Sequence, residues 1–168
     1  MSGKYFIVTG APGTGKSSVV KELLSQKPGF IIYDIDWLVE AASKLSGKDV
    51  IFDQSVWKDY RSLWFTVLQM ALKNSQQVVF FAAIDKGDIS ELGSEISNNT
   101  AWCLLDCDDN TRKVRLEERS NWTSDQSLEA INDAKELREQ IEYVINTDTK
   151  SISDVAREVR NWIESDYL

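Results

Sequence analysis

The sequence predicts an α/β fold, a three-layer, doubly wound parallel sheet of five strands with helices on both faces. Short apolar segments alternate with segments of helical periodicity along the whole chain, which is the order of elements that a parallel sheet with crossover helices requires. One of these segments, Gln77–Ile84, is almost wholly apolar, as expected for a strand that helices cover on both sides. The length of 168 residues fits one domain of ordinary size, so we expect a single domain over residues 1–168.

Five segments are predicted as strands because they are short, apolar and rich in β-branched or aromatic residues. They are Tyr5–Thr9, Phe30–Ile35, Gln77–Ile84, Ala101–Asp106 and Tyr143–Asn146. Apolar residues at helical spacing predict helices between them, over Ser17–Ser25, residues 37–76, Thr111–Arg119 and Leu128–Ile141. A last helix follows Ser151 and Asp154, whose spacing resembles a capping box.

The charge balance disfavours a nucleic-acid partner. The net charge is −8, whereas proteins that bind nucleic acid usually carry an excess of Lys and Arg for phosphate contacts. The longest apolar run, Val78–Ile84, is far shorter than the ~18 residues that a membrane-spanning helix needs. Met1–Tyr5 leads directly into a strand, so no signal peptide is expected. We therefore expect a cytoplasmic protein with no nucleic-acid or membrane partner.

The sequence contains no histidine, which excludes Ser-His-Asp hydrolysis and His-ligated metal sites. Its two cysteines, Cys103 and Cys107, are spaced C-x-x-x-C, and this spacing matches no common zinc or redox pattern. We expect two reduced and mostly buried thiols.

A glycine-rich turn joins the first predicted strand to the first predicted helix. It fits the pattern G-x-x-x-x-G-K-[ST] at every fixed position, as Gly10-Ala11-Pro12-Gly13-Thr14-Gly15-Lys16-Ser17. Glycines allow backbone N–H groups to turn toward phosphate oxygens, and the positive end of the following helix points at the same oxygens. Lys16 is expected to reach the β- and γ-phosphates and Ser17 to ligate Mg²⁺. The turn, with the adjacent Ser18, predicts a site for ATP and Mg²⁺.

Two acidic residues, Asp34 and Asp36, stand at the end of the second predicted strand. Their spacing puts both carboxylates on one face if the strand continues that far, and ligands of doubly wound sheets bind beyond the carboxyl ends of the strands. One carboxylate could hold Mg²⁺ while the other accepts a proton from a substrate hydroxyl. Asp36 could instead cap a helix that begins at Trp37, and both roles are compatible.

A short helix after the fourth predicted strand carries Arg112, Arg115 and Arg119, with Asp108 to Thr111 as its cap. At about 100° per residue the three side chains fall within an arc of about 60°. Guanidinium groups suit ring stacking and bidentate phosphate contacts. From spacing alone, a solvated face that pairs with nearby glutamates is an equal alternative.

Together, the glycine-rich turn, the pair Asp34 and Asp36, and the arginine helix resemble the small P-loop kinases, most closely the shikimate, gluconate and nucleoside kinase branch. The resemblance implies a strand order of 2-3-1-4-5. It also implies that Asp34 is a magnesium-site carboxylate and that Asp36 contacts the substrate hydroxyl. Asp85, at the end of the third predicted strand, resembles a second metal-site carboxylate of many P-loop proteins, with an ordinary strand-end turn as the alternative.

The same resemblance assigns roles to residues around the nucleotide. Arg115 corresponds to an arginine that stacks on adenine, and Arg119 to one that stabilises charge on the transferred phosphate from the edge of a lid. Residues 120–127 resemble a short lid, although they include no Lys or Arg. Arg138 resembles a substrate-contacting arginine where the lid returns to the body. The turn Thr147–Lys150, with Thr149, would form the adenine wall.

Residues 37–76 correspond to the acceptor-binding helical region of these kinases. Arg61 resembles the arginine that binds the anionic group of shikimate, and the aromatic side chains of the segment either stack on a flat substrate or pack internally. The glycine signature that shikimate kinases carry after the third strand is replaced by Ala82-Ala83-Ile84. The histidine of the gluconate kinase acceptor loop is absent, because the chain has none.

We therefore expect an ATP- and Mg²⁺-dependent kinase that phosphorylates a hydroxyl group of a small metabolite, such as a nucleoside or a sugar acid. Lys16, Asp36 and Arg119 are the expected catalytic residues. Two alternatives remain at this point, a nucleoside monophosphate kinase and a non-catalytic ATP-binding regulatory module. The sequence identifies neither the acceptor nor whether the protein is a monomer or a homodimer.

Overall fold

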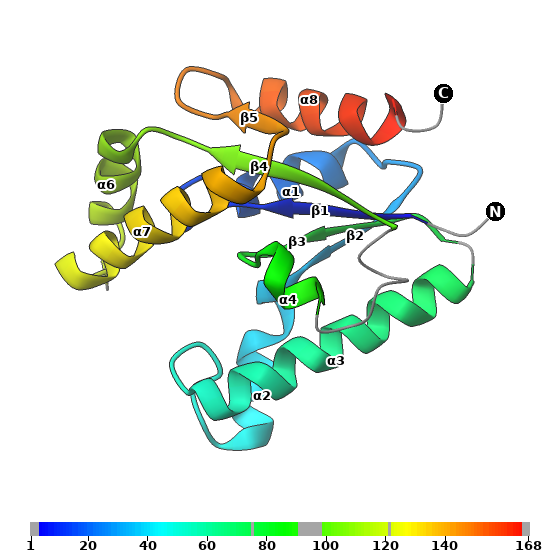
Figure 1. The fold of residues 1–168 in the computed structure, drawn as a ribbon, viewed down its shortest axis with the longest axis horizontal. Coiled ribbons are helices and arrows are strands. Elements are labelled where there is room, and N and C mark those ends of the chain that lie inside the picture. The colour runs from blue at the N-terminus through cyan, green and yellow to red at the C-terminus, as the bar shows by residue number, and fades with distance from the viewer. Residues whose placement is uncertain (1–3, 75, 91–98, 121, 166–168) are drawn as a thin grey trace.

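The computed structural model describes residues 4–74, 76–90, 99–120 and 122–165 of the chain. Its sheet has five parallel strands in the order β2-β3-β1-β4-β5, which confirms the predicted order. The strands are β1 (Tyr5–Thr9), β2 (Ile31–Asp34), β3 (Val78–Phe81), β4 (Thr100–Asp106) and β5 (Val144–Asn146). Figure 1 shows the carboxyl ends of these strands at the same edge of the sheet.

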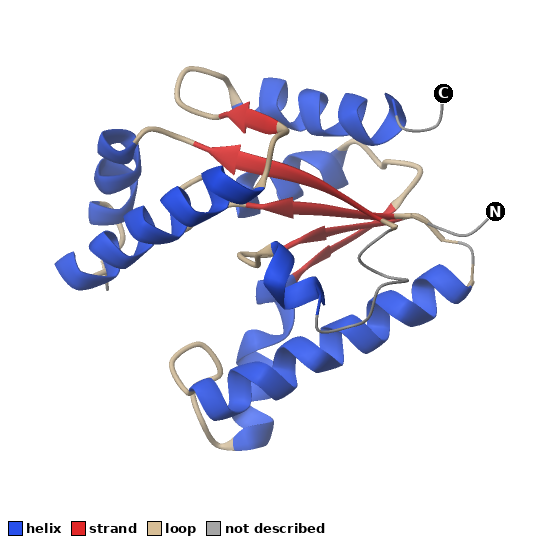
Figure 2. Ribbon diagram, in the orientation of Figure 1, coloured by secondary structure: helices blue, strands red, loops and turns tan. Residues whose placement is uncertain are grey.

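Helices cover both faces of the sheet (Figure 2). On one face lie α1 (Lys16–Ser25) and α8 (Ile152–Ser165). On the other lie α3 (Gln54–Lys73), α4 (Lys86–Ser90) and α7 (Ser124–Gln140). The remaining helices, the 3₁₀ helix η1 (Ile35–Leu38), α2 (Val39–Ser46) and α6 (Asp109–Glu117), follow the carboxyl ends of β2 and β4. The predicted three-layer, doubly wound fold is confirmed.

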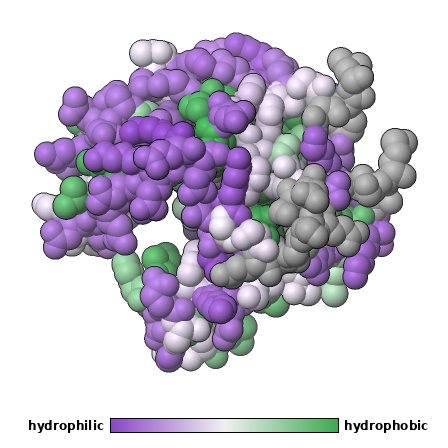
Figure 3. Space-filling view, in the orientation of Figure 1, coloured by the Kyte–Doolittle hydropathy of each residue, from purple (hydrophilic) through white to green (hydrophobic). Residues whose placement is uncertain are grey.

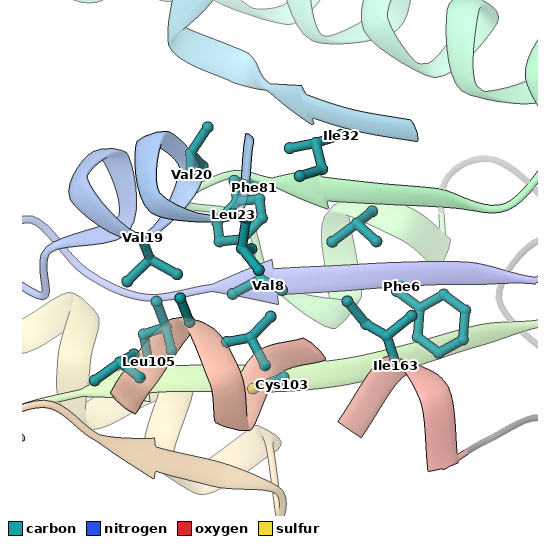
Figure 4. Close-up of a cluster of buried hydrophobic side chains, with 14 of the residues drawn as sticks. Phe6, Val8, Val19, Val20, Leu23, Ile32, Phe81, Cys103, Leu105 and Ile163 are labelled. Carbon is teal, nitrogen blue, oxygen red and sulfur yellow. The ribbon is translucent and has the colours of Figure 1, made fainter. Parts of the chain in front are cut away.

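Strand β3 illustrates why the sequence folds this way. Successive side chains of a strand point to opposite faces. Val79 and Phe81 accordingly pack into the cluster beneath α1 and α8, part of which Figure 4 shows. Val78 and Phe80 pack into the cluster beneath α3. All four side chains are fully buried, so a continuous apolar run is what this central position requires.

Several predicted boundaries shift. The second strand ends at Asp34 rather than Ile35, because the Asp34 side chain accepts a hydrogen bond from the Asp36 N–H at 3.0 Å and starts η1. The third strand ends at Phe81, and Lys86 begins the short helix α4, which the sequence did not predict. Residues 37–76 form several helices, with a left-handed turn at Gly47 (φ 69°) after α2; Ser75 lies outside the described residues.

Helix α7 begins earlier than predicted, because Thr123 and Gln126 form a capping box at its N-terminus. Half of the predicted lid at residues 120–127 is therefore helical, from Ser124 onward, and Asn121 lies outside the described residues. Cys103 and Cys107 are both free and buried, as predicted. Within the described ranges, no helix combines the length and the apolar character needed to cross a membrane.

Candidate active site

The glycine-rich turn lies between the end of β1 and the start of α1, as its motif predicts. Gly15 adopts φ 88° immediately before the helix, a conformation that favours glycine. Gly10 lies so close to β4 that a Cβ atom there would stand 2.5 Å from the Leu105 carbonyl oxygen. The Thr14 hydroxyl donates to the Ala11 carbonyl at 3.1 Å. These features place the N-terminus of α1 toward the carboxyl edge of the sheet, where it can attract anions.

Lys16 folds back over this turn. Its ammonium group donates hydrogen bonds to the carbonyls of Gly10 and of Ala11, the second at 3.3 Å. Burial lowers the pKa of Lys16 to about 8, although the nearby carboxylates of Asp36 and Asp34 partly oppose this shift. A desolvated cation with only carbonyl partners gains strongly from an anionic oxygen.

A cavity of about 390 Å³ opens beside the turn and brings together residues from distant parts of the chain. Six of its lining residues belong to the turn and the start of α1, namely Pro12, Gly13, Gly15, Lys16, Ser17 and Ser18. The others are Ile35, Asp36, Ile51, Gln54, Trp57, Ala83, Arg119 and Trp122. The predicted catalytic residues Lys16, Asp36 and Arg119 and the predicted metal ligand Ser17 thus share one cavity.

The two acidic residues at the end of β2 differ in their burial and contacts. Asp34 is buried at 5% exposure and caps η1, so the helix cap considered for Asp36 is made by Asp34 instead. Burial raises the pKa of Asp34, while its hydrogen bond from the Asp36 backbone opposes the shift. The Asp36 side chain is exposed and lines the cavity. The local turn therefore leaves the Asp36 carboxylate available to a ligand.

Two arginines of α6, Arg112 and Arg115, contact the glycine-rich turn, and Arg119 follows the end of this helix. Asp108 caps this helix, as predicted, by accepting from the N–H groups of Asn110 and Thr111. Arg115 donates to the Gly13 carbonyl at 3.3 Å and to the side chain and carbonyl of Thr147 at 3.0 and 2.8 Å. Arg119 lines the cavity, with its guanidinium 5.2 Å from the ring centre of Trp122.

Arg112 was named in the sequence as one of three arginines, but no role was assigned to it. Its side chain is fully buried and donates to the Pro12 carbonyl at 2.8 Å, to the Asp106 carboxylate at 2.7 Å and to the Cys107 carbonyl at 3.2 Å. Arg112 therefore links the glycine-rich turn to the end of β4 through hydrogen bonds. The available signal was Asp106, an acid at the end of an apolar strand, which needs a buried cationic partner.

The two arginines predicted to contact substrate lie elsewhere. Arg138 forms ion pairs with Asp106 at 2.6 Å and with Asp109 at 3.1 Å, and the bond to Asp106 raises the pKa of Arg138. Arg61 forms an ion pair with Asp88. Neither arginine lines the cavity that holds Asp36.

Two smaller cavities are lined by some of the remaining predicted residues. Asp85 lines one of about 170 Å³ together with Asp88, Asp133 and Glu136, apart from Ser17 and Asp36. The other, about 220 Å³, lies on the far side of the turn between α1, Arg115 and the start of α8. Thr147 and Lys150 line it, whereas the exposed Thr149 in the same turn does not.

The donor set in the main cavity fits Mg²⁺ that arrives with a nucleotide. Mg²⁺ prefers oxygen ligands and is usually held by one or two carboxylates, waters and substrate phosphates rather than by a complete protein cage. The Ser17 hydroxyl and the Asp36 carboxylate line the same cavity, with Asp34 beside them. Within the part of the chain that the structure describes, no group of three or more acidic or cysteine side chains forms a closed metal site.

Comparison with known proteins decides the family. The model of the shikimate kinase family matches residues 12–164. The chain belongs to the shikimate kinase family. It is therefore a P-loop kinase, and the predicted resemblance is confirmed. Members of this family are ATP-dependent kinases of small molecules. No curated protein matches the sequence.

Solved structures support the same fold. A putative kinase from Chloroflexus aurantiacus has a TM-score of 0.72 at 13% identity, with 98% of this chain and 97% of that chain covered. The tunicamycin resistance protein of Deinococcus radiodurans has a TM-score of 0.69 at 20% identity, with coverage of 96% and 95%. A shikimate kinase from Acinetobacter baumannii in complex with shikimate has a TM-score of 0.66 at 14% identity, with coverage of 99% and 96%. At these identities the similarity concerns the fold alone.

Proposed function

We propose that this kinase transfers the γ-phosphoryl group of ATP to a hydroxyl group of a small metabolite. The observation that carries the proposal is the position of Asp36, whose exposed carboxylate lines the same cavity as Lys16, Ser17 and Arg119. Binding of Mg²⁺ and a nucleotide alone would need the cations and one metal-site carboxylate, for which Asp34 is proposed below, but no second carboxylate. A carboxylate beside the phosphate site is what a hydroxyl acceptor needs for its proton.

In the proposed reaction the acceptor oxygen attacks the γ-phosphorus, and the bond from the γ-phosphorus to the bridging oxygen of ADP breaks. The hydroxyl proton passes to the Asp36 carboxylate. Lys16 and Arg119 stabilise the charge on the transferred group, and their fixed positions supply most of the catalysis. Ser17 and Asp34 would hold Mg²⁺, which neutralises charge on the β- and γ-phosphates.

The adenine would occupy the cavity between Arg115 and the turn Thr147–Lys150. This cavity shares Gly15 and Ser18 with the main one, so a nucleotide can extend from one to the other along the N-terminus of α1. A phosphate acceptor is less well supported than a hydroxyl, because residues 120–127 include no Lys or Arg to bind a second phosphate.

The Asp36→Asn variant tests the role of this carboxylate. We expect it to bind ATP with unchanged affinity, because the amide keeps the shape of the side chain, but to lose transfer by about 10²- to 10⁴-fold because the proton acceptor is gone. ATP affinity is measured by calorimetry. Transfer is measured as ADP release with Mg²⁺ against nucleosides, nucleoside monophosphates, sugar acids and neutral alcohols, with Lys16→Ala as the blank.

The matched control is Asp133→Asn, which changes a carboxylate that lines a different cavity and should leave both readouts unchanged. Equal turnover in the Asp36→Asn variant and the unmodified protein would show that Asp36 is not the proton acceptor. Preferential transfer to nucleoside monophosphates would instead assign a phosphate acceptor.

A further inference from the structure

The end of the main cavity that faces α3 is built mostly from apolar and aromatic side chains. Ile51 and Trp57 come from the loop before α3 and its first turn, and Trp122, which precedes α7, lines the same cavity. Ile51 is 51% exposed although it is aliphatic. Figure 3 shows the molecule hollowed at this edge of the sheet, between a hydrophilic upper part and a lower part with hydrophobic side chains at its rim. Such a wall suits an apolar or flat ligand surface.

The only cations that line this cavity are Lys16 and Arg119 among the described residues, and the residues outside the described ranges include no Lys or Arg. Both cations are at the phosphate end. With ATP bound, the charges of Lys16 and Arg119 would be paired with the phosphates. The polar groups left at the acceptor end would be the carboxylate of Asp36 and the neutral amide of Gln54. An anionic acceptor would then lie beside Asp36 without a cationic partner, and this arrangement is costly.

Arg61 and Arg138, the arginines predicted to contact substrate, are held by acidic side chains. Arg61 and Asp88 form an ion pair whose side chains are only 15% and 24% exposed. Arg138 donates to Asp106, Asp109 and the Cys107 carbonyl. To turn either arginine into the cavity would leave a partly buried carboxylate unpaired, which strongly disfavours the change.

The aromatic walls carry neutral polar groups. Trp57 packs against Tyr60, with ring centres 5.8 Å apart and a tilt of 38°, so its position is supported from behind by a buried side chain. The Trp122 indole Nε1 is buried and has no hydrogen-bond partner among the described residues. Because this nitrogen is buried, a ligand oxygen would reach it only after the indole turns toward the cavity, and that contact would satisfy the donor.

We infer that the acceptor of this kinase is an uncharged hydroxyl compound with a flat or apolar ring, which binds between Ile51, Trp57 and Trp122 and places its hydroxyl at Asp36. The inference rests on the proposed function, because it names the substrate class of that site. It distinguishes the acceptor of this chain from a carboxylate-bearing compound such as shikimate, which is bound to the Acinetobacter baumannii enzyme.

The test uses pairs of hydroxyl compounds in which one member is neutral and the other carries an anionic group. They are methyl shikimate and shikimate, methyl 4-(hydroxymethyl)benzoate and 4-(hydroxymethyl)benzoate, and thymidine and its 5′-monophosphate. Binding to the chain of 168 residues is measured by calorimetry with Mg²⁺ and a non-hydrolysable ATP analogue. We expect the neutral member of at least one pair to bind about tenfold or more tightly than its anionic counterpart, since one unpaired buried charge costs more than 1.4 kcal/mol.

Two variants sharpen the test. Trp57→Ala should weaken binding of the neutral member about tenfold or more, whereas Trp57→Phe should keep it. Trp37→Ala is the matched control, because Trp37 is 47% exposed and does not line the cavity. Ile51→Arg adds the missing cation at a half-exposed position and should shift the preference toward the anionic member about tenfold.

Tighter binding of the anionic members overturns the inference, and so does the absence of binding by every compound while the ATP analogue binds. An unchanged affinity in the Trp57→Ala variant overturns it as well. Measurement of ADP release with the same compounds tests the proposed function separately from the class of acceptor that binds. Neutral compounds that bind but are not phosphorylated would support the inference and contradict the function, whereas phosphorylation of only anionic compounds would do the reverse.

Discussion

Among the single residues of the site, Lys16 has a pKa that is subject to two opposing influences. Burial against the turn lowers its pKa to about 8, and Asp36 and Asp34 draw the pKa back toward its usual value. The lowered pKa means that the protein without a ligand disfavours the charged form. Phosphate oxygens favour the charged form, so binding of ATP and protonation of Lys16 should be thermodynamically linked.

This linkage predicts how ATP binding depends on pH. Below pH 7 Lys16 is already protonated, so it adds no pH dependence. Above pH 8 the free protein carries neutral Lys16, ATP binding must take up a proton, and the Kd should rise by about tenfold per pH unit. Calorimetry at pH 7 and pH 9, in buffers of different ionisation enthalpy, measures both the affinity and the proton uptake.

Lys16→Arg is the control, because a guanidinium keeps its charge throughout this range. Its ATP affinity should be weaker but independent of pH from 7 to 9, with no proton uptake at pH 9. If the unmodified protein showed a constant Kd over the same range, Lys16 would not titrate there and the linkage would be wrong.

The residues of the glycine-rich turn could be predicted from the sequence because the motif is contiguous and its geometry is local. Asp36 was also predicted, although the cap that frees its side chain is made by Asp34. Arg112 could not be assigned, since its burial depends on Pro12, Asp106 and Cys107 together. The same reason applies to Arg61 and Arg138, whose carboxylate partners are distant in the sequence.

At the scale of elements, strand β4 and helices α6 and α7 form one ionic unit with the glycine-rich turn. Asp106 at the end of β4 accepts from Arg112 of α6 and from Arg138 of α7. Arg112 also donates a hydrogen bond to the Pro12 carbonyl, and Arg115 donates one to the Gly13 carbonyl. The shape of the turn is thus set by side chains of α6 as well as by its own glycines.

The Arg112→Met variant tests this unit. It keeps the volume but removes the hydrogen bonds to Pro12 and Asp106, so we expect a loss of about 3–5 kcal/mol in the free energy of unfolding, the usual cost of breaking a buried ion pair. ATP affinity should fall too, because the turn loses a support. Urea denaturation and calorimetry at a temperature where circular dichroism shows the variant folded measure the two effects separately.

Arg160→Met is its control. Arg160 pairs with Glu164 on the surface of α8 at 2.7 Å, with side chains 37% and 50% exposed, and its loss should cost less than about 1 kcal/mol. Equal effects of the two variants on stability, or an unchanged ATP affinity in Arg112→Met, would show that Arg112 does not support the turn.

Element boundaries were predicted less well than element types. The helical region of residues 37–76 was correct as a region, but the turn at Gly47 that divides α2 from α3 was not foreseen. The start of α7 was placed too late because Thr123 and Gln126 were not recognised as a capping box. Caps depend on one or two side chains, whereas helical periodicity extends over many, so periodicity is the stronger signal.

At the scale of the whole molecule, one strand connects the two hydrophobic layers. Phe80 and Phe81 are neighbours on β3 and both are fully buried, yet they face opposite sides of the sheet. Trp64 packs 5.5 Å from Phe80 in one layer, and Trp162 packs 5.4 Å from Phe6 in the other. Since both layers share the same strands, we predict that they unfold together as a single domain.

The variants Phe80→Ala and Phe81→Ala each remove a buried ring from one layer and should each cost about 3–5 kcal/mol. Met70→Ala, at a residue 61% exposed on α3, is the control and should change stability by less than about 0.5 kcal/mol. Fluorine NMR of protein labelled with 5-fluorotryptophan follows Trp64 and Trp162 separately during urea denaturation. In both core variants the two signals should share one midpoint, because loss of either layer exposes the strands that support the other. Distinct midpoints would mean that the layers are separate cooperative units, and that the sheet does not couple the side of the molecule that carries α3 to the side that carries α1.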